Sequence, residues 1–237
     1  MTPRYPVFAT RRWAMLAVML MAMITVLFFF VDMPLARTLH VSSTPWVFAV
    51  FNVIDELGSS ELYLAPALVL YVWALLAARR GWTLPLGRDA DRVARGSLFV
   101  ILTMALGGIV TVLLKNLVAR ARPELLIEQG LYGFGTAFAR AHEFDSFPSS
   151  HTQAAFAAAA ALAILAPRLR VPLMLLACSV ATARVVNLDH YLSDVLGAAF
   201  IALSSAAFLA PRILNADSGW PLRTPWRWFG SRTATRA

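Results

Sequence analysis

The stretch WAMLAVMLMAMITVLFFFV, from Trp13 to Val31, holds 19 consecutive residues without a charged side chain and follows Arg11 and Arg12. An α-helix rises about 1.5 Å per residue, so about 20 apolar residues cross the hydrocarbon core of a bilayer. The stretch therefore predicts a transmembrane helix, and a chain that contains such a helix belongs in a membrane.

The rest of the chain repeats this pattern. Of its 237 residues, 59% are hydrophobic and only 14% are charged, which is unlike a domain whose surface faces water. The fifth charge-free run is the shortest and reaches spanning length only when it is extended past Arg184. We therefore expect an all-α fold, a single membrane-embedded domain over residues 1–237 built as a bundle of six transmembrane helices, followed by a tail at 212–237. The six spans are predicted near residues 13–31, 62–78, 96–114, 152–167, 171–187 and 190–211.

Lysine and arginine alternate between the two sides of these spans. Most of the 21 lie before the first span, between the second and third, between the fourth and fifth, and after the sixth. Basic loops are retained on the cytoplasmic side of the inner membrane, so both termini are expected in the cytoplasm. The remaining three loops are then expected at the outer, periplasmic face. This topology explains the formal charge of +8, and nucleic acid is not expected as a partner.

Two segments outside the spans are predicted to lie at the membrane surfaces. Residues 42–60 carry Trp46, Phe48 and Phe51 among few charges, which favours a short helix at the outer interface. A loose hydrophobic loop fits that segment nearly as well. The tail at 212–237 mixes three tryptophans with arginines, a composition typical of an anchor to the anionic cytoplasmic leaflet.

Three polar clusters follow predicted spans on the outer side. They are KNLVARARP from Lys115 to Pro123, PSSH from Pro148 to His151, and RVVNLDHYLSD from Arg184 to Asp194. Charged and titratable groups at the ends of apolar helices mark functional sites in membrane proteins. We therefore expect the three clusters to form one site at the outer face.

Three cations in these clusters predict a site for an oxyanion. Lys115 is the only lysine beside 20 arginines, and Arg122 follows it by about two helical turns, so both point to one side if the helix continues through them. With Arg184 they suit a phosphate dianion. Taken alone, Lys115 and Arg122 also fit an anchor at the membrane interface. The surplus of positive charge makes a metal site less natural, so none is predicted.

The remaining polar residues of the three clusters are candidates for the catalytic acid, base and nucleophile. His190 and Asp194 are four residues apart, so on one helix the carboxylate accepts a hydrogen bond from one ring nitrogen and leaves the other free to attack. Ser149 or Ser150 is expected to cap the fourth span, where free backbone N–H groups bind anions. His151 lies beside them on the same side. An ordinary N-cap and a structural histidine are the plainer alternatives.

The three clusters, in this order, resemble the signature of the type 2 phosphatidic acid phosphatase family, which is related to the vanadium haloperoxidases. Its pattern is K-x6-R-P, then P-S-G-H, then S-R-x5-H-x3-D, and the spacing matches from Lys115 to Asp194. Two positions depart from it: Ser150 replaces a glycine and Ala183 replaces a serine. Neither replacement removes a catalytic group, but the Cβ of Ser150 is expected to reshape the phosphate pocket.

The resemblance implies a role for each residue. It implies His190 as a nucleophile that forms a phosphohistidine, Asp194 as its partner, and His151 as the acid for the leaving group and then the base for water. Phosphate would be held by Lys115, Arg122, Ser149, Ser150 and Arg184, with no metal and no cofactor. Because His190 must be neutral while His151 is protonated, a bell-shaped pH profile is expected.

The resemblance implies an integral membrane enzyme that hydrolyses a phosphomonoester or pyrophosphate on a lipid of the surrounding bilayer. The candidate substrates are undecaprenyl pyrophosphate, phosphatidylglycerophosphate, phosphatidic acid and lipid A, and family breadth ranks lipid A last. A lipid phosphotransferase shares the first half of the mechanism and remains open, as does a membrane transporter or flippase. A haloperoxidase is disfavoured because it needs vanadate and usually a soluble fold.

Overall fold

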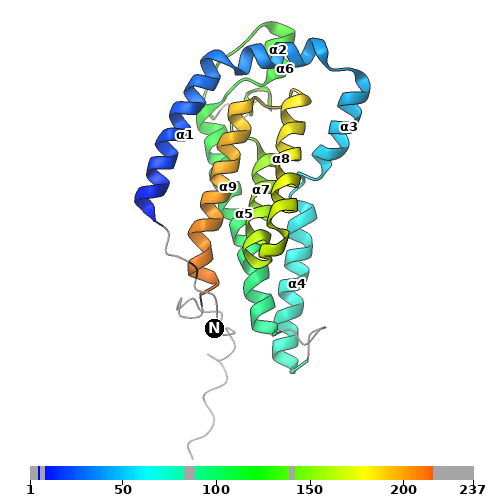
Figure 1. Ribbon diagram of the computed structural model, residues 1–237, viewed down its shortest axis with the longest axis vertical. Coiled ribbons are helices and arrows are strands. Elements are labelled where there is room, and N and C mark those ends of the chain that lie inside the picture. Colours follow the sequence, from blue (N-terminus) through cyan, green and yellow to red (C-terminus); the bar gives the residue numbers. More distant parts are fainter. Residues whose placement is uncertain (1–4, 6–8, 83–88, 139–141, 216–237) are drawn as a thin grey trace, which may run out of the picture.

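The protein is a bundle of α-helices (Figure 1). The computed structural model describes residues 5, 9–82, 89–138 and 142–215, and within these ranges the only β-pairing is an isolated bridge between Arg120 and Phe134. The predicted all-α class is confirmed. The helices are α1 Thr10–Phe30, α2 Asp32–Ser42, α3 Pro45–Glu56, α4 Glu61–Arg80, α5 Ala90–Val118, α6 Pro123–Gln129, α7 Ser150–Leu165, α8 Arg170–Val186 and α9 Leu192–Ile213, with 3₁₀ turns at His142–Phe144 and Pro167–Leu169.

Each of the six predicted spans falls on a helix, namely α1, α4, α5, α7, α8 and α9. Among the described residues, five segments are long and apolar enough to cross a membrane: Thr10–Phe30, Pro45–Arg80, Ala90–Val118, Pro167–Val186 and Leu192–Ile213. The fifth span was expected to be the shortest of the six, but the shortest of the six helices is α7, with 16 residues. The fifth charge-free run is short because arginines bound it, but α8 continues through both Arg170 and Arg184.

The central helix of the bundle is α7, which packs against α5, α8 and α9 (Figure 1). Its small side chains allow the close approach of neighbouring helices that stabilises membrane bundles. On the facing side of α5, a Cβ at Gly107 would collide with the side-chain amide of Gln153. The buried alanines of α7 are Ala154, Ala155, Ala157, Ala158, Ala159, Ala160 and Ala161.

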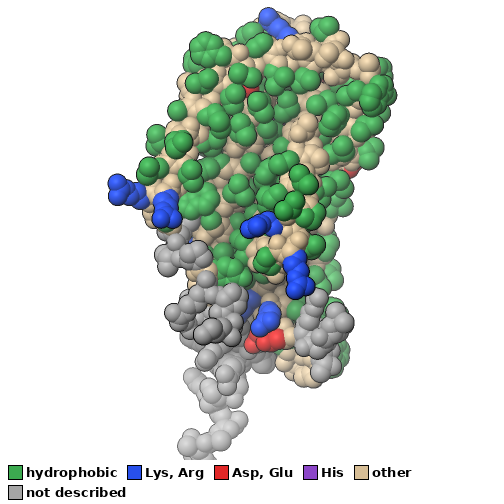
Figure 2. All heavy atoms as spheres, viewed as in Figure 1, with side chains coloured by type: hydrophobic (Ala, Val, Ile, Leu, Met, Phe, Trp, Pro, Cys, Tyr) green, Lys and Arg blue, Asp and Glu red, His purple; other side chains and the backbone are tan. Residues whose placement is uncertain are grey.

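The outside of the bundle is apolar. None of the spanning window of α1 is buried, and its Val18 and Phe30 side chains are 70% and 73% exposed. Figure 2 shows hydrophobic side chains over most of the visible face, with most of its lysines and arginines in the half that contains the start of α1. Such a surface is stable against lipid and would be aggregation-prone in water.

The two ends of the bundle differ. The start of α1 and the end of α9 lie at one end, while α2 and α6 cover the other (Figure 1). The helix α3 confirms the short helix expected within residues 42–60. The helix α2 has no predicted counterpart, because its 11 residues include Asp32 and Arg37 and form no long charge-free run. The predicted tail from residue 212 begins inside α9, and its part from residue 216 lies outside the described residues.

Candidate active site

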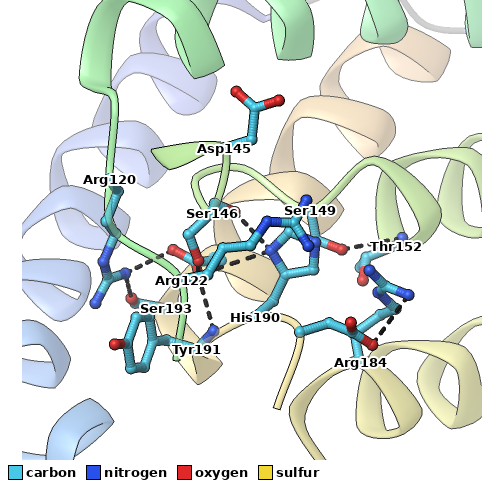
Figure 3. Close-up of polar contacts among 12 residues, drawn as sticks. Arg120, Arg122, Asp145, Ser146, Ser149, Thr152, Arg184, His190, Tyr191 and Ser193 are labelled. Atoms are coloured by element: carbon cyan, nitrogen blue, oxygen red, sulfur yellow. Dashed lines mark hydrogen bonds and ion pairs between the residues drawn. The ribbon is translucent and has the colours of Figure 1, made fainter. Parts of the chain in front are cut away.

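The three polar clusters converge at the end of the bundle that α2 and α6 cover. The first follows α5, the second leads into α7, and the third joins α8 to α9. Figure 3 shows His190 between Arg120 on one side and Arg184 on the other. The chain therefore brings together residues that lie far apart in the sequence.

His190 is buried, with 2% of its surface exposed, and precedes the first residue of α9. Its Nδ1 lies 2.6 Å from the carbonyl oxygen of Ser146. A carbonyl oxygen only accepts hydrogen bonds, so Nδ1 carries the proton and Nε2 keeps its lone pair. Burial lowers the pKa of His190 well below its ordinary value, and the nearby charges of Arg184, Lys115 and Arg122 lower it further. The ring is therefore neutral and nucleophilic at Nε2.

The predicted hydrogen bond between Asp194 and His190 is wrong. Asp194 Oδ2 lies 3.9 Å from His190 Nδ1, beyond hydrogen-bond distance, and the Ser146 carbonyl takes the expected position. The physical reason is that α9 begins at Leu192, so His190 lies outside the helix on which the four-residue spacing was based. Asp194 instead accepts hydrogen bonds from the Ser146 hydroxyl at 2.6 Å and the Tyr191 amide at 2.8 Å.

Lys115 and Arg122 do not lie on one continuous helix, so the condition under which both were expected to point to one side is not met. The helix α5 ends at Val118, and Ala119 turns the chain through a left-handed conformation with a φ of 45°. Lys115 nevertheless donates to the Asp145 carbonyl, and Arg122 Nε donates to the His142 carbonyl at 3.0 Å. Burial and the nearby charge of Arg184 lower the pKa of Arg122. Both cations act electrostatically on His190, so the break in α5 still delivers them to one site.

Arg184 is held by two carboxylates that were not among the predicted site residues. Its Nη1 lies 2.5 Å from Asp55 Oδ2 and 3.1 Å from Asp189 Oδ2. Asp189 lies in the α8–α9 connection, and burial raises the pKa of its carboxyl. Asp55 was not predicted as a site residue. The sequence indicates it only as an acidic residue at the end of the apolar run that forms α3.

The serines and His151 occupy the start of α7. Ser149 is the N-cap, since its hydroxyl accepts from the Thr152 amide at 3.4 Å, as Figure 3 shows, and Ser150 is the first helical residue. The helix terminus thus supplies the partial positive charge that favours anions. His151 packs closely on Gly58 in the α3–α4 connection, where an added Cβ would lie 2.7 Å from His151 Cβ.

Three further residues belong to the site, although the sequence motifs assign no role to any of them. Ser146 supplies the carbonyl that holds His190, Arg120 contacts Asp194 at 2.6 Å, and Asp32 contacts Arg120 at 2.9 Å. Arg120 and Asp32 are 88 residues apart in the sequence, so no local pattern predicts their contact. Within the described ranges, no three His, Cys, Asp or Glu side chains are grouped in a way that could hold a metal ion.

The family assignment rests on a match that covers both the helices and the three clusters. Residues 96–216, just over half of the chain, match the model of the PAP2 superfamily. The chain belongs to the PAP2 superfamily. The predicted resemblance to type 2 phosphatidic acid phosphatases is thereby confirmed.

Two lipid A 1-phosphatases are similar to part of this PAP2 chain. The protein from Rhizobium etli is 37% identical over 82 residues, which are 35% of this chain and 34% of that protein. The protein from Rhizobium johnstonii is 35% identical over 82 residues, which are 35% of this chain and 32% of that protein. The matched segment spans about a third of the length of these relatives.

Two solved structures share the fold of this PAP2 chain. A transmembrane PAP2-type phosphatidylglycerolphosphate phosphatase from Bacillus subtilis has a TM-score of 0.58 at 18% identity, over 84% of this chain and 94% of that one. Aquifex aeolicus LpxE has a TM-score of 0.52 at 20% identity, over 74% of this chain and 92% of that one. With the apolar helices, this shared fold makes the protein a multi-pass membrane protein.

Proposed function

We propose that this PAP2 protein is a lipid phosphatase that removes phosphate from a lipid of the surrounding bilayer, with His190 as the nucleophile. The observation that carries the proposal is the environment of His190. Its Nδ1 is tied to the Ser146 carbonyl, and no described residue forms a hydrogen bond with Nε2. Lys115, Arg122 and Arg184 all lie close enough to affect its charge. A neutral imidazole facing three cations suits attack on a phosphate.

The reaction proceeds in two steps. The lone pair of His190 Nε2 attacks phosphorus, the bond from phosphorus to the lipid oxygen breaks, and His151 donates a proton to that oxygen. His151 then takes a proton from water, the water oxygen attacks phosphorus, and the phosphorus–nitrogen bond breaks to release inorganic phosphate. The three cations and the start of α7 bind the phosphoryl oxygens. Arg184 Nε, which is buried and has no partner in the described part of the chain, is a donor that a phosphate oxygen satisfies.

The substrate proposed first is the 1-phosphate of lipid A. The likeness to two lipid A 1-phosphatases favours it over the polyprenyl and phospholipid phosphates that family breadth ranks first, although the matched segment is 82 residues. Phosphatidylglycerophosphate, phosphatidic acid and undecaprenyl pyrophosphate complete the set to be tested. The site is proposed to face the periplasm from the inner membrane, because basic residues gather at the opposite half of the bundle (Figure 2).

The test measures phosphate release by the purified full-length protein in detergent from each of these lipids, with and without EDTA. The variants are His190→Ala and, as a matched control, His40→Ala, which changes an exposed histidine on α2. Release that survives EDTA, persists in His40→Ala and disappears in His190→Ala supports the proposal. Release abolished by EDTA would point to a metal enzyme, and transfer of phosphate to a second lipid without free phosphate would point to a phosphotransferase.

A further inference from the structure

A buried ion cluster lies beside His190 and joins Asp194, its expected partner, to three residues without a role in the proposed chemistry. Arg120, Asp32, Ser193 and Asp194 are each no more than 2% exposed. Arg120 Nη1 donates to Asp194 Oδ1 and Ser193 Oγ, both at 2.6 Å, and Arg120 Nη2 donates to Asp32 Oδ2 at 2.9 Å. Figure 3 shows Arg120 beside Ser193, on the side of His190 away from Arg184.

Burying these charges is expensive unless each one is paired and hydrogen-bonded. The pairing here is thorough. Asp32 accepts from the backbone amide of Ser193 at 3.2 Å and from its hydroxyl, in addition to Arg120. The guanidinium carbon of Arg120 lies 4.2 Å from the ring centre of Tyr191 and 5.0 Å from that of Phe28. The result is a guanidinium held in one position by both its hydrogen bonds and the aromatic rings around it.

The cluster reaches His190 through Ser146. Because Arg120 occupies Oδ1 of Asp194, the other oxygen, Oδ2, accepts from the Ser146 hydroxyl at 2.6 Å. The carbonyl of the same serine lies 2.6 Å from His190 Nδ1. A shift of Asp194 would therefore move the Ser146 carbonyl, and that carbonyl decides which nitrogen of His190 carries the proton.

The series of contacts that starts at His190 ends at Asp32, in the first turn of α2. Asp32 is the first residue of α2, directly after the first predicted span, and its ion pair with Arg120 joins α2 to the α5–α6 connection. The Tyr132 hydroxyl bridges the same region, since it donates to the Phe28 carbonyl at 2.5 Å and accepts from Arg120 at 3.2 Å. The junction of α1 and α2 is thus connected to the candidate site by buried charge.

We propose that Arg120 and Asp32 are positioning residues, which hold Asp194 and the Ser146 carbonyl so that His190 keeps its proton on Nδ1 and presents Nε2 to the phosphate. This inference rests on the proposed role of His190. The two residues lie apart from the cations that bind phosphate. Their loss therefore slows the chemical step and leaves substrate binding in place, which separates this role from that of Lys115, Arg122 and Arg184.

The test compares Asp32→Asn and Ser193→Ala with two matched controls, Asp91→Asn and Ser42→Ala, which change exposed residues. For each variant, kcat and KM are measured on the best lipid substrate, together with the unfolding temperature in detergent. We expect kcat to fall about ten- to hundredfold in both cluster variants, the loss seen when the outer partners of a metal-binding histidine are removed. KM is expected to stay within about twofold, and the controls to match the parent protein.

A second readout does not depend on activity. In protein labelled with ¹⁵N-histidine, the ring signals of His190, assigned with His190→Ala, report which nitrogen is protonated. The parent protein is expected to show the proton on Nδ1, and the cluster variants a mixture of tautomers. If the parent releases no phosphate while this tautomer shift is observed, the proposed function fails and the positioning role stands.

Two outcomes would overturn the inference. One is a folded Asp32→Asn or Ser193→Ala protein with unchanged kcat and an unchanged His190 tautomer. The other is a rise in KM at constant kcat, which would place the cluster in phosphate binding. If Asp32→Asn does not fold, Ser193→Ala decides, because it removes one hydroxyl and no charge. Arg120→Lys adds a graded check, and it is expected to retain more activity than Arg120→Met because it keeps the charge.

Discussion

At the scale of single residues, the candidate site holds one buried histidine among cations. Burial and three nearby positive charges disfavour the imidazolium form of His190, and the Ser146 carbonyl fixes the proton on Nδ1. The sequence motifs predicted which residues meet there. They assigned no role to Ser146, Arg120, Asp32 or Asp55, because a backbone carbonyl leaves no sequence pattern and the partners of these charges lie far away in the sequence.

The pH dependence of kcat/KM follows from the pKa of His190. The ring must be neutral to attack, and its pKa is lowered, so the acid limb of the bell-shaped profile is expected at pH values below the ordinary imidazole pKa of about 6.5. Removing a cation by Arg122→Gln raises that pKa and moves the acid limb to higher pH. Arg37→Gln, on the exposed surface of α2, serves as the control. An acid limb that does not move in Arg122→Gln would contradict this account.

Asp55 is expected to orient Arg184 for phosphate binding. Asp55→Asn removes a carboxylate charge 2.5 Å from the guanidinium and leaves Asp189 as the remaining anionic partner. We expect KM for the lipid phosphate to rise about tenfold, the effect of losing a charged hydrogen bond of about 1.5 kcal/mol. Steady-state kinetics check this, with Glu56→Gln on the adjacent exposed side chain as control. An equal change in both variants would indicate a general effect of surface charge.

At the scale of helices, packing positions the site more than helix length does. The apolar runs predicted α1, α4, α5, α7, α8 and α9 because an apolar run is a local property of the sequence. The 16-residue α7 shows the limit of that reasoning, since its place at the centre comes from its small alanine side chains and not from its length. The connection before α4 approaches α7 equally closely, and Gly58 makes that approach possible.

Gly58→Ala is expected to destabilise the protein and reduce its activity together. The new Cβ would lie 2.7 Å from His151 Cβ and 2.9 Å from Val180 Cγ1, so the backbone must move. Overpacking of this kind costs about 1–3 kcal/mol, and here the displaced residue is the proposed acid and base. The unfolding temperature in detergent and kcat are the measurements. Gly96→Ala is the control, since its nearest contacts, at 3.5 Å from Leu165, are ordinary.

At the scale of the whole molecule, the two ends of the bundle have different chemistry. The candidate site lies under α2 and α6, while the start of α1 and the end of α9 lie at the opposite end (Figure 1). The alternation of basic loops predicts this polarity from the sequence. It does not predict which long-range contacts close the site, because these depend on how α1, α2 and the α5–α6 connection pack in three dimensions.

The orientation in the membrane is tested by thiol labelling. In a Cys178→Ser background, Ser42→Cys marks the α2 end and Asp91→Cys marks the opposite end; both positions are exposed. With an impermeant reagent on intact spheroplasts, we expect Ser42→Cys to react and Asp91→Cys to react only after lysis. The reverse pattern would place the site on the cytoplasmic side.

The central claim is that His190 is the nucleophile, and its most direct test is the trapping of the phosphorylated enzyme. Protein mixed with ³²P-labelled lipid substrate is quenched rapidly in alkali, digested and analysed by mass spectrometry. We predict acid-labile phosphate on the peptide that contains His190, and none in His190→Ala. Release of labelled phosphate by the parent protein with no phosphohistidine at any time point, or with the label on His151, would contradict the account.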